Sequence, residues 1–204
     1  MSGDVHVRFC ERLGVKFPRT THLVVMCDTK TACEQAEQRV REIFTRLGLE
    51  LHPEKTRRVD LSRGMAGFDF LGCHLHKRMS GPLWQKCHQR VYFLQRWPSR
   101  RAMHRVQQRV KALTSRTVCH RDLRETIAQL NPVLRGWGGY FRTGNAANKF
   151  GQVDDYVTWR LKRLLLKRHG RQLRAGQPNQ WTADFFYALG LHRLRGTIRY
   201  PEAA

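Results

Sequence analysis

Apolar residues in the first third of the chain form one short run followed by a helical stripe. Residues 23–26 are long enough for a buried strand and too short for a helix. Beyond them, Thr31 and Glu34 predict a capping box at the start of a helix, and Gly48 predicts its C-terminal end. The apolar stripe of this helix consists of Ala32, Ala36, Val40, Ile43, Phe44 and Leu47.

Three further segments have the composition of short strands and are separated by turn-forming residues. Together with the preceding helix they predict a small α/β layer over residues 22–76. The three segments are residues 49–51, 56–61 and 68–75.

From Ser99 onward the pattern changes to amphipathic helices. One stripe predicts a first helix, and apolar residues at helical spacing over 123–130 predict a second. Asn131 and Pro132 have the N-cap and first-turn preferences that would begin a third helix. The first stripe consists of Met103, Val106, Val110 and Leu113, and later helices are predicted over residues 148–168 and 178–189. The fold class is therefore α+β, with a small sheet and one helix followed by a helical bundle.

The charge is concentrated in the helical part. The chain carries 38 Lys+Arg against 16 Asp+Glu, a formal net charge of +22. Residues 1–72 hold 12 basic and 10 acidic side chains, whereas residues 73–200 hold 26 and 5. Such a surplus repels itself unless a polyanion or counterions cover it. Nucleic acid is the expected partner, bound through its phosphates with strong salt dependence and little sequence choice.

Neither a membrane span nor secretion is expected from the sequence. No window approaches 18 consecutive apolar residues, and residues 1–13 lack the apolar run of a signal peptide. We therefore expect a cytoplasmic protein.

The cysteines predict neither a disulfide framework nor a metal site. Six of them lie singly along the chain without a CxxC pair. Several stand beside histidines, and these residues could supply zinc ligands, but their spacing fits no finger or ribbon. They are Cys73, His74, His76, Cys87, His88, Cys119 and His120.

Three stretches of the chain carry a family resemblance. Residues 47–56 read Leu-Gly-Leu-Glu-Leu-His-Pro-Glu-Lys-Thr, and residues 67–72 read Gly-Phe-Asp-Phe-Leu-Gly. At this spacing they resemble the late palm blocks of group II intron reverse transcriptases. Residues 130–142, Leu-Asn-Pro-Val-Leu-Arg-Gly-Trp-Gly-Gly-Tyr-Phe-Arg, resemble the thumb or maturase-specific domain of the same family, which grips intron RNA. The similarity covers residues 23–201.

The resemblance also implies that the polymerase motif is degenerate. The family places Tyr-Ala-Asp-Asp directly before the strand that corresponds to residues 23–26, where this chain has Arg19, Thr20, Thr21 and His22. The family's aspartates hold the two divalent ions of nucleotide transfer, and threonine and histidine cannot replace them. The upstream palm and the fingers are expected to be missing as well. No catalytic residue or cofactor is predicted, and Mg²⁺ would matter only if polymerase activity survives.

Three ranges and one leading function follow from this resemblance. Residues 1–22 are expected to be a degenerate N-terminal segment, residues 23–80 a partial palm, and residues 81–204 the thumb and maturase-specific domain. The implied function is binding of structured RNA, a group II intron, with assistance to its splicing. An alternative is RNA-directed DNA polymerase activity, either residual or with a partner that supplies the missing palm and fingers. A decayed remnant with general affinity for nucleic acid also stays open.

Basic residues outside the apolar stripes are the candidates for phosphate contact. Lys55 matches the family's Lys-Thr pair near the template-primer duplex. Arg135 and Arg142 lie seven residues apart, close to one helix face, and could straddle a phosphate run. The glycine-bearing connectors 170–176 and 190–196 are expected to be flexible enough to follow a phosphate backbone. The candidate RNA-binding residues are Lys55, Arg100, Arg101, Arg105, Arg109, Lys111, Arg135, Arg142, Lys162, Arg163, Lys167, Arg193 and Arg195.

Two further groups of residues have competing interpretations. Phe70, Leu71 and Gly72 resemble the family's primer-grip hairpin, where glycine allows close backbone approach to nucleic acid, but a purely structural hairpin is an open alternative. Aromatic side chains in the 130–142 motif could stack on unpaired bases. Their i, i+3, i+4 spacing favours the core instead. They are Trp137, Tyr140 and Phe141.

Overall fold

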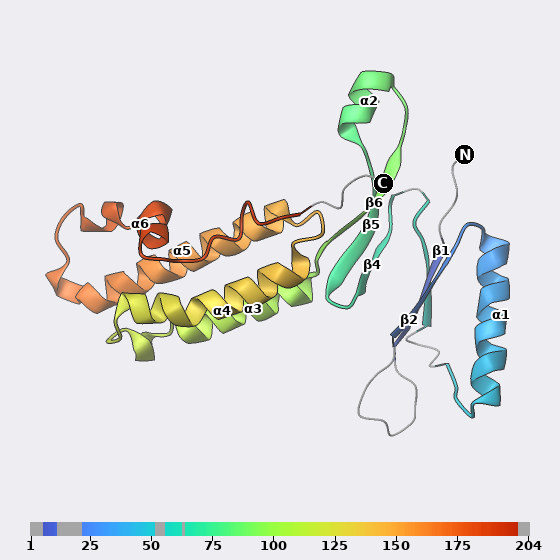
Figure 1. Ribbon diagram of the computed structural model, residues 1–204, viewed down its shortest axis with the longest axis horizontal. Coiled ribbons are helices and arrows are strands. Elements are labelled where there is room, and N and C mark those ends of the chain that lie inside the picture. Colours follow the sequence, from blue (N-terminus) through green and yellow to red (C-terminus); the bar gives the residue numbers. More distant parts are fainter. Residues whose placement is uncertain (1–5, 12–21, 52–55, 63, 200–204) are drawn as a thin grey trace. The chain divides into compact units, whose positions relative to one another are not determined.

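The computed structural model describes residues 6–11, 22–51, 56–62 and 64–199, which separate into two compact units (Figure 1). Unit 1 takes its residues from Met1–Phe68 and Leu75–Gln95. Unit 2 takes its residues from Asp69–His74 and Arg96–Ala204. The domain ranges expected from the resemblance stay predictions.

Unit 1 contains a three-stranded antiparallel sheet in the order β2-β1-β3. β2 (His22–Cys27) confirms the strand predicted at residues 23–26, and β3 (Thr56–Asp60) confirms the one predicted from residue 56. The central strand, β1 (His6–Glu11), was not predicted, although its sequence His-Val-Arg-Phe-Cys-Glu alternates polar and apolar residues as a strand does. Of the strand predicted at residues 49–51, the structure has only a single β-bridge residue, Leu51.

Helix α1 (Lys30–Arg46) packs against β1 and β2. Its N-cap is Thr29, whose side chain accepts a hydrogen bond from the Ala32 N–H, so the predicted capping box at Thr31 is wrong by two residues. The predicted glycine end is confirmed: Gly48 has a φ of 66°, and its N–H donates to the Thr45 carbonyl. The Leu49 N–H donates to the Phe44 carbonyl, which completes a Schellman motif and explains why no strand begins at residue 49.

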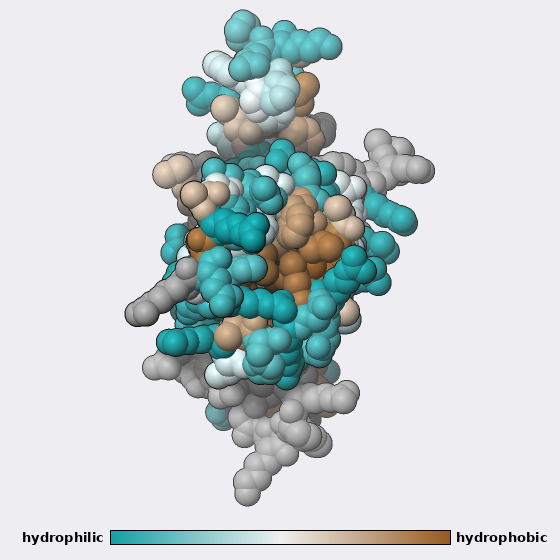
Figure 2. Space-filling view, turned by 90° about the vertical axis from the view of Figure 1, so that its left-hand side faces the viewer, coloured by the Kyte–Doolittle hydropathy of each residue, from teal (hydrophilic) through white to brown (hydrophobic). Residues whose placement is uncertain are grey.

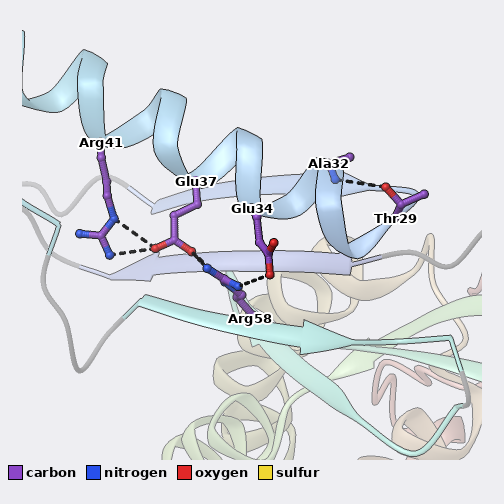
Figure 3. Close-up of polar contacts among 6 residues, drawn as sticks. All are labelled: Thr29, Ala32, Glu34, Glu37, Arg41 and Arg58. Carbon is purple, nitrogen blue, oxygen red and sulfur yellow. Dashed lines mark hydrogen bonds and ion pairs between the residues drawn. The ribbon is translucent and has the colours of Figure 1, made fainter.

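The side of α1 that faces the sheet carries a buried carboxylate (Figure 3). Glu37 is buried, and its Oε1 accepts hydrogen bonds from Arg41, one turn further along the helix, at 3.1 and 2.8 Å. Its Oε2 accepts a hydrogen bond of 2.8 Å from Nε of Arg58 on β3. The half-exposed Arg58 also contacts Glu34 at 3.3 Å. A charge-assisted network therefore joins α1 to β3.

The predicted apolar stripe of α1 is only partly buried. Cys33 and Glu37 are the buried residues of this helix. Ile43 and Leu47, at the end of the stripe, are 47% and 64% exposed. The end of the predicted stripe therefore lies outside the face of α1 that packs against β1 and β2.

A second three-stranded sheet has the order β4-β5-β6, and its strands contribute residues to both units. The single strand predicted over residues 68–75 is instead two strands, β4 (Gly67–Phe70) and β5 (Cys73–Met79), joined by a two-residue turn. A helix, α2 (Gly81–Cys87), and a strand, β6 (Tyr92–Pro98), follow and were not predicted.

Unit 2 is a helical bundle that contains the main apolar core. The predicted stripe of α3 (Arg100–Leu113) faces this core, and Ser99 caps the helix by accepting a hydrogen bond from the Ala102 N–H. α5 (Ala147–His169) confirms the predicted fourth helix within one residue at each end. An α+β fold class is confirmed. Short 3₁₀ turns lie at Arg116–Val118, Gly170–Gln172 and Gln177–Gln180.

Helix α4 (Leu123–Phe141) is continuous through Pro132, so the two helices predicted here are one. Proline removes one helical N–H, and the helix accommodates it because Leu130 and Leu134, on either side, are fully buried. Asn131 is not an N-cap, and its side chain bonds to a distant segment described below.

The helix predicted over residues 178–189 is shorter. α6 (Ala183–Ala188) begins after Thr182, whose side chain accepts a hydrogen bond from the Phe185 N–H.

Figure 2 is the view onto the end of unit 2 that is drawn at the left of Figure 1. It shows an apolar area surrounded by hydrophilic side chains. Among the described residues, no helix combines the length and apolar character needed to span a bilayer.

Candidate nucleic-acid interface

The segment after α6 is fixed to two helices at both of its turns. Asn131 of α4 donates from Nδ2 to the Gly190 carbonyl and accepts from the His192 N–H, each at 2.8 Å. Asp154 of α5, itself buried, accepts the N–H groups of Leu194 at 3.0 Å and Arg195 at 2.8 Å. The expectation of a flexible connector over residues 190–196 is therefore wrong.

Close packing against α4 depends on a glycine. A Cβ atom on Gly138 would lie 2.6 Å from Cδ2 of Leu194, which is fully buried. Further along, the Arg199 N–H donates to the Arg142 carbonyl at 2.8 Å. Residues 190–199 thus run beside α4 in the same direction, from Asn131 to Arg142.

A pocket of about 570 Å³ lies between α4 and this segment. Arg135 and Arg142, the pair predicted to share a helix face, stand on its α4 side. Arg199 and His192 stand on the opposite side. The remaining lining residues are Gly138, Gly139, Gly196, Thr197 and Ile198.

The pocket has a positive electrostatic character. In the part of the chain that the structure describes, no hydrogen bond or ion pair engages the guanidinium groups of Arg135, Arg142 or Arg199. Burial and the nearby Arg135 both lower the pKa of His192 below its ordinary value, and Asp154 opposes them only in part. A concave site lined by one sign of charge concentrates its field on an approaching counterion.

Asp154 holds the segment in place at an electrostatic cost. Burial raises the pKa of its carboxyl group, while the hydrogen bonds from Arg195 and Leu194 and the charge of Arg193 act in the opposite direction. The carboxylate therefore has a structural role, with both oxygens accepting backbone N–H groups of the segment that forms one wall of the pocket.

Most of the other predicted phosphate-binding residues lie on the surface of unit 2. Lys162 is half-buried. Arg163 stacks over the ring of Trp159 at 4.8 Å from its centroid, and Arg193 over Tyr187 at 5.5 Å. Their positions are compatible with phosphate contact, which stays a prediction for each of them. The exposed residues of this set are Arg100, Arg101, Arg105, Arg109, Lys111, Arg163, Lys167, Arg193 and Arg195.

The three aromatic residues of the 130–142 motif have different environments. Phe141 is buried, and the half-buried Trp137 packs against it and against Phe150, with ring centroids 5.0 and 5.4 Å apart. Tyr140 is 56% exposed, so its predicted core position is wrong. Its hydroxyl group donates to the Leu71 carbonyl at 2.7 Å, a tertiary contact that the spacing does not reveal.

The hairpin that resembles a primer grip is anchored within unit 2. Leu71 and Gly72 have φ angles of 47° and 79°, as in the type I′ turn of a two-residue hairpin. The carbonyl of Leu71 accepts from Tyr140, and that of Gly72 accepts from the Ser99 N–H at 2.9 Å. These two hydrogen bonds support the structural interpretation of the hairpin. A role of Phe70, Leu71 and Gly72 in nucleic-acid binding stays a prediction.

The remaining predictions concern Lys55, the four positions of the polymerase motif and a possible metal site. Lys55, Arg19, Thr20 and Thr21 are not among the described residues, and His22 is the first residue of β2. Within the described ranges, no three His, Cys, Asp or Glu side chains are grouped so as to hold a metal ion.

The helices that carry the pocket and the exposed basic residues are similar to a known family. Residues 103–181 match the family model of the group II intron maturase-specific domain. This match supports a group II intron maturase, and the domain is associated with RNA binding and splicing. No curated protein matches the chain significantly.

The match to the maturase-specific domain runs from α3 through α5 to Trp181, so it includes one wall of the pocket. The other wall, with His192 and Arg199, lies beyond it. Neither residue was a candidate from the sequence, because no local pattern places either of them next to α4. The one usable signal was Asn131, a polar residue in the middle of a helix that needed a distant partner.

Proposed function

We propose that the chain binds structured RNA, a group II intron, through the basic surface of unit 2 and assists its splicing without adding nucleotides. The RNA itself performs the splicing chemistry. The protein contributes contacts to phosphates and 2′-hydroxyl groups that stabilise the folded ribozyme.

The observation that supports this proposal is the coincidence of charge and family match. Residues 73–200 hold 26 basic and 5 acidic side chains, and the maturase-specific match at residues 103–181 lies within them. The guanidinium groups of three pocket arginines have no hydrogen-bond or ion-pair partner among the described residues, and many other basic residues are exposed. A folded core beneath them lets these cations act as a fixed surface.

The expectation that the chain is not a polymerase rests on the sequence. The positions that would carry the family's metal-binding aspartates read Arg19, Thr20, Thr21 and His22. Hard divalent cations require carboxylate oxygens there. We further propose a cytoplasmic location, because no window of the sequence approaches 18 consecutive apolar residues.

A binding titration at increasing salt tests the RNA-binding part. A folded group II intron RNA, an unrelated structured RNA of equal length and duplex DNA are each titrated with the full chain. We expect the intron RNA to bind tightest and log K to fall with log salt at a slope of about −4 or steeper, as for about six neutralised phosphates. A flat salt response contradicts the electrostatic basis, and equal affinity for all three nucleic acids indicates a remnant without a specific RNA.

Two activity assays test the remaining parts. Splicing of the intron RNA is followed at low Mg²⁺ with and without the protein, and a higher yield of ligated exons is expected with it. Primer extension with Mg²⁺ and deoxynucleotides should stay at background, and incorporation above background would favour the reverse transcriptase alternative.

A further inference from the structure

The pocket between α4 and the C-terminal segment combines features that define an anion site. Its charged lining consists of Arg135, Arg142 and Arg199, with His192 beside them and no carboxylate among the lining residues. The guanidinium groups come from both walls, so an anion between them would meet cations from two sides. Guanidinium groups bind phosphate oxygens through paired N–H donors, which gives such a site geometric selectivity.

The lining also indicates which part of a nucleotide the pocket fits. Among the described residues that line it there is no Phe, Tyr or Trp, so a base could stack only on the His192 ring or on a guanidinium plane, and cationic groups dominate the lining. Gly139 opens the α4 wall: a Cβ atom there would meet no atom within 4 Å. The helix surface at the pocket is therefore bare backbone, which leaves room for a tetrahedral group and its flanking oxygens.

The pocket is built rather than incidental. Its C-terminal wall is fixed by hydrogen bonds to Asn131 and Asp154, and the buried Leu194 fits against Gly138. Arg199 is brought to Arg142 by the hydrogen bond between their backbones. The backbone that carries these arginines is therefore already in place before an anion binds, which lowers the conformational entropy lost on binding.

We propose that this pocket seats one backbone phosphodiester of the bound RNA, held jointly by Arg135, Arg142 and Arg199. This inference rests on the proposed function and names one phosphate site within it. The pocket uses residues beyond the matched maturase-specific domain, so the C-terminal segment is part of the RNA-binding surface.

Filling the pocket without changing its charge is the first test. Gly139→Leu places a side chain at the pocket wall, and its matched control, Gly136→Leu, changes an exposed position of the same helix that is also free of contacts within 4 Å. We expect Gly139→Leu to weaken binding of the intron RNA about tenfold, the equivalent of about 1.4 kcal/mol for a charged hydrogen bond. Gly136→Leu should bind as the unmodified chain does. Circular dichroism confirms that both variants are folded, and equal binding by the two variants overturns the proposal.

A double-mutant cycle tests whether the arginines share one phosphate. Arg135→Gln and Arg199→Gln should each weaken binding about tenfold, and each should reduce the salt slope by about 0.7 to 0.9. The double variant should lose much less than the product of the two single losses, because Arg135 and Arg199 act on the same phosphate and loss of either one already displaces it from the pocket. Arg105→Gln and Lys167→Gln change exposed residues on α3 and α5 and form the control pair. In their double variant, the fold-loss of RNA affinity should equal the product of the two single losses. Multiplicative losses in the pocket pair would reject a shared phosphate while leaving RNA binding intact, whereas absence of RNA binding by the unmodified chain would reject the proposed function.

Adenosine monophosphate separates the RNA backbone from a free nucleotide as the source of the phosphate. Calorimetric titration of the full chain with this probe should give no saturable submillimolar binding. Such binding, abolished by Arg135→Gln, would identify a mononucleotide site and overturn the assignment to an RNA phosphodiester.

Discussion

Replacing Gly138 by alanine should show how much the tertiary fit of the C-terminal segment contributes to stability. The added Cβ atom would lie 2.6 Å from Cδ2 of Leu194, against a normal separation of about 3.5 to 4.0 Å between non-bonded carbons. Leu194 is fully buried, and its N–H is bonded to Asp154, so it has little freedom to move away. Overpacking of this kind costs about 1–3 kcal/mol.

An opposing effect makes a matched control necessary. Alanine is favoured over glycine in a helix by about 1 kcal/mol. Gly136→Ala receives this gain without a clash, because its position on α4 is exposed and no atom lies within 4 Å of the new Cβ. The net expectation is that Gly138→Ala lowers the free energy of unfolding by about 1 kcal/mol, while Gly136→Ala raises it by about 1 kcal/mol.

Thermal unfolding of the full chain, followed by circular dichroism at the helical band, measures this difference. About 2 kcal/mol should separate the Tm values of the two variants by roughly 8 °C for a unit of about 100 residues. If Gly138→Ala is as stable as Gly136→Ala, the fit between Leu194 and α4 does not constrain the molecule as described.

Three further perturbations have defined outcomes. Glu37→Gln should lower the free energy of unfolding by about 1 kcal/mol in urea denaturation, because it removes the buried charge partner of the half-exposed Arg58. Glu34→Gln changes an exposed pair with the same arginine and should alter this free energy by less than about 0.5 kcal/mol. Asp154→Asn leaves one of two backbone N–H groups without an acceptor, so we expect a loss of about 1–3 kcal/mol and faster proteolysis after residue 190; unchanged proteolysis would contradict the anchoring role. RNA phosphate in the pocket should raise the pKa of His192, so that binding takes up a proton and affinity increases as the pH falls through that pKa; an identical pH profile for His192→Gln would place the titration elsewhere.

Local patterns predicted α3 and α5 of unit 2 well. The stripe of α3 faces the core, that helix begins directly after Ser99, and α5 has nearly the predicted bounds. These features depend on residues within one or two turns of each other, which a sequence displays directly. The same holds for Gly48, whose left-handed backbone ends α1.

Predictions failed where a distant contact competed with a local preference. Asn131 has the preferences of an N-cap, yet its amide bonds to Gly190 and His192, and the helix continues through it. Tyr140 has core spacing, yet its hydroxyl group reaches Leu71 and the ring stays exposed. In both cases a polar group found a partner that spacing along the chain cannot indicate.

The sequence by itself determined the α+β class, the basic character of the helical part and the pairing of Arg135 with Arg142 on one helix face. These follow from periodicity and composition, which are sums over neighbouring residues. Tertiary structure alone brought Arg199 and His192 opposite those arginines, because backbone hydrogen bonds to Asp154 and Arg142 set the path of the C-terminal segment. A pocket between two segments exists only when both are in place, and for that reason no single stretch of the chain encodes it.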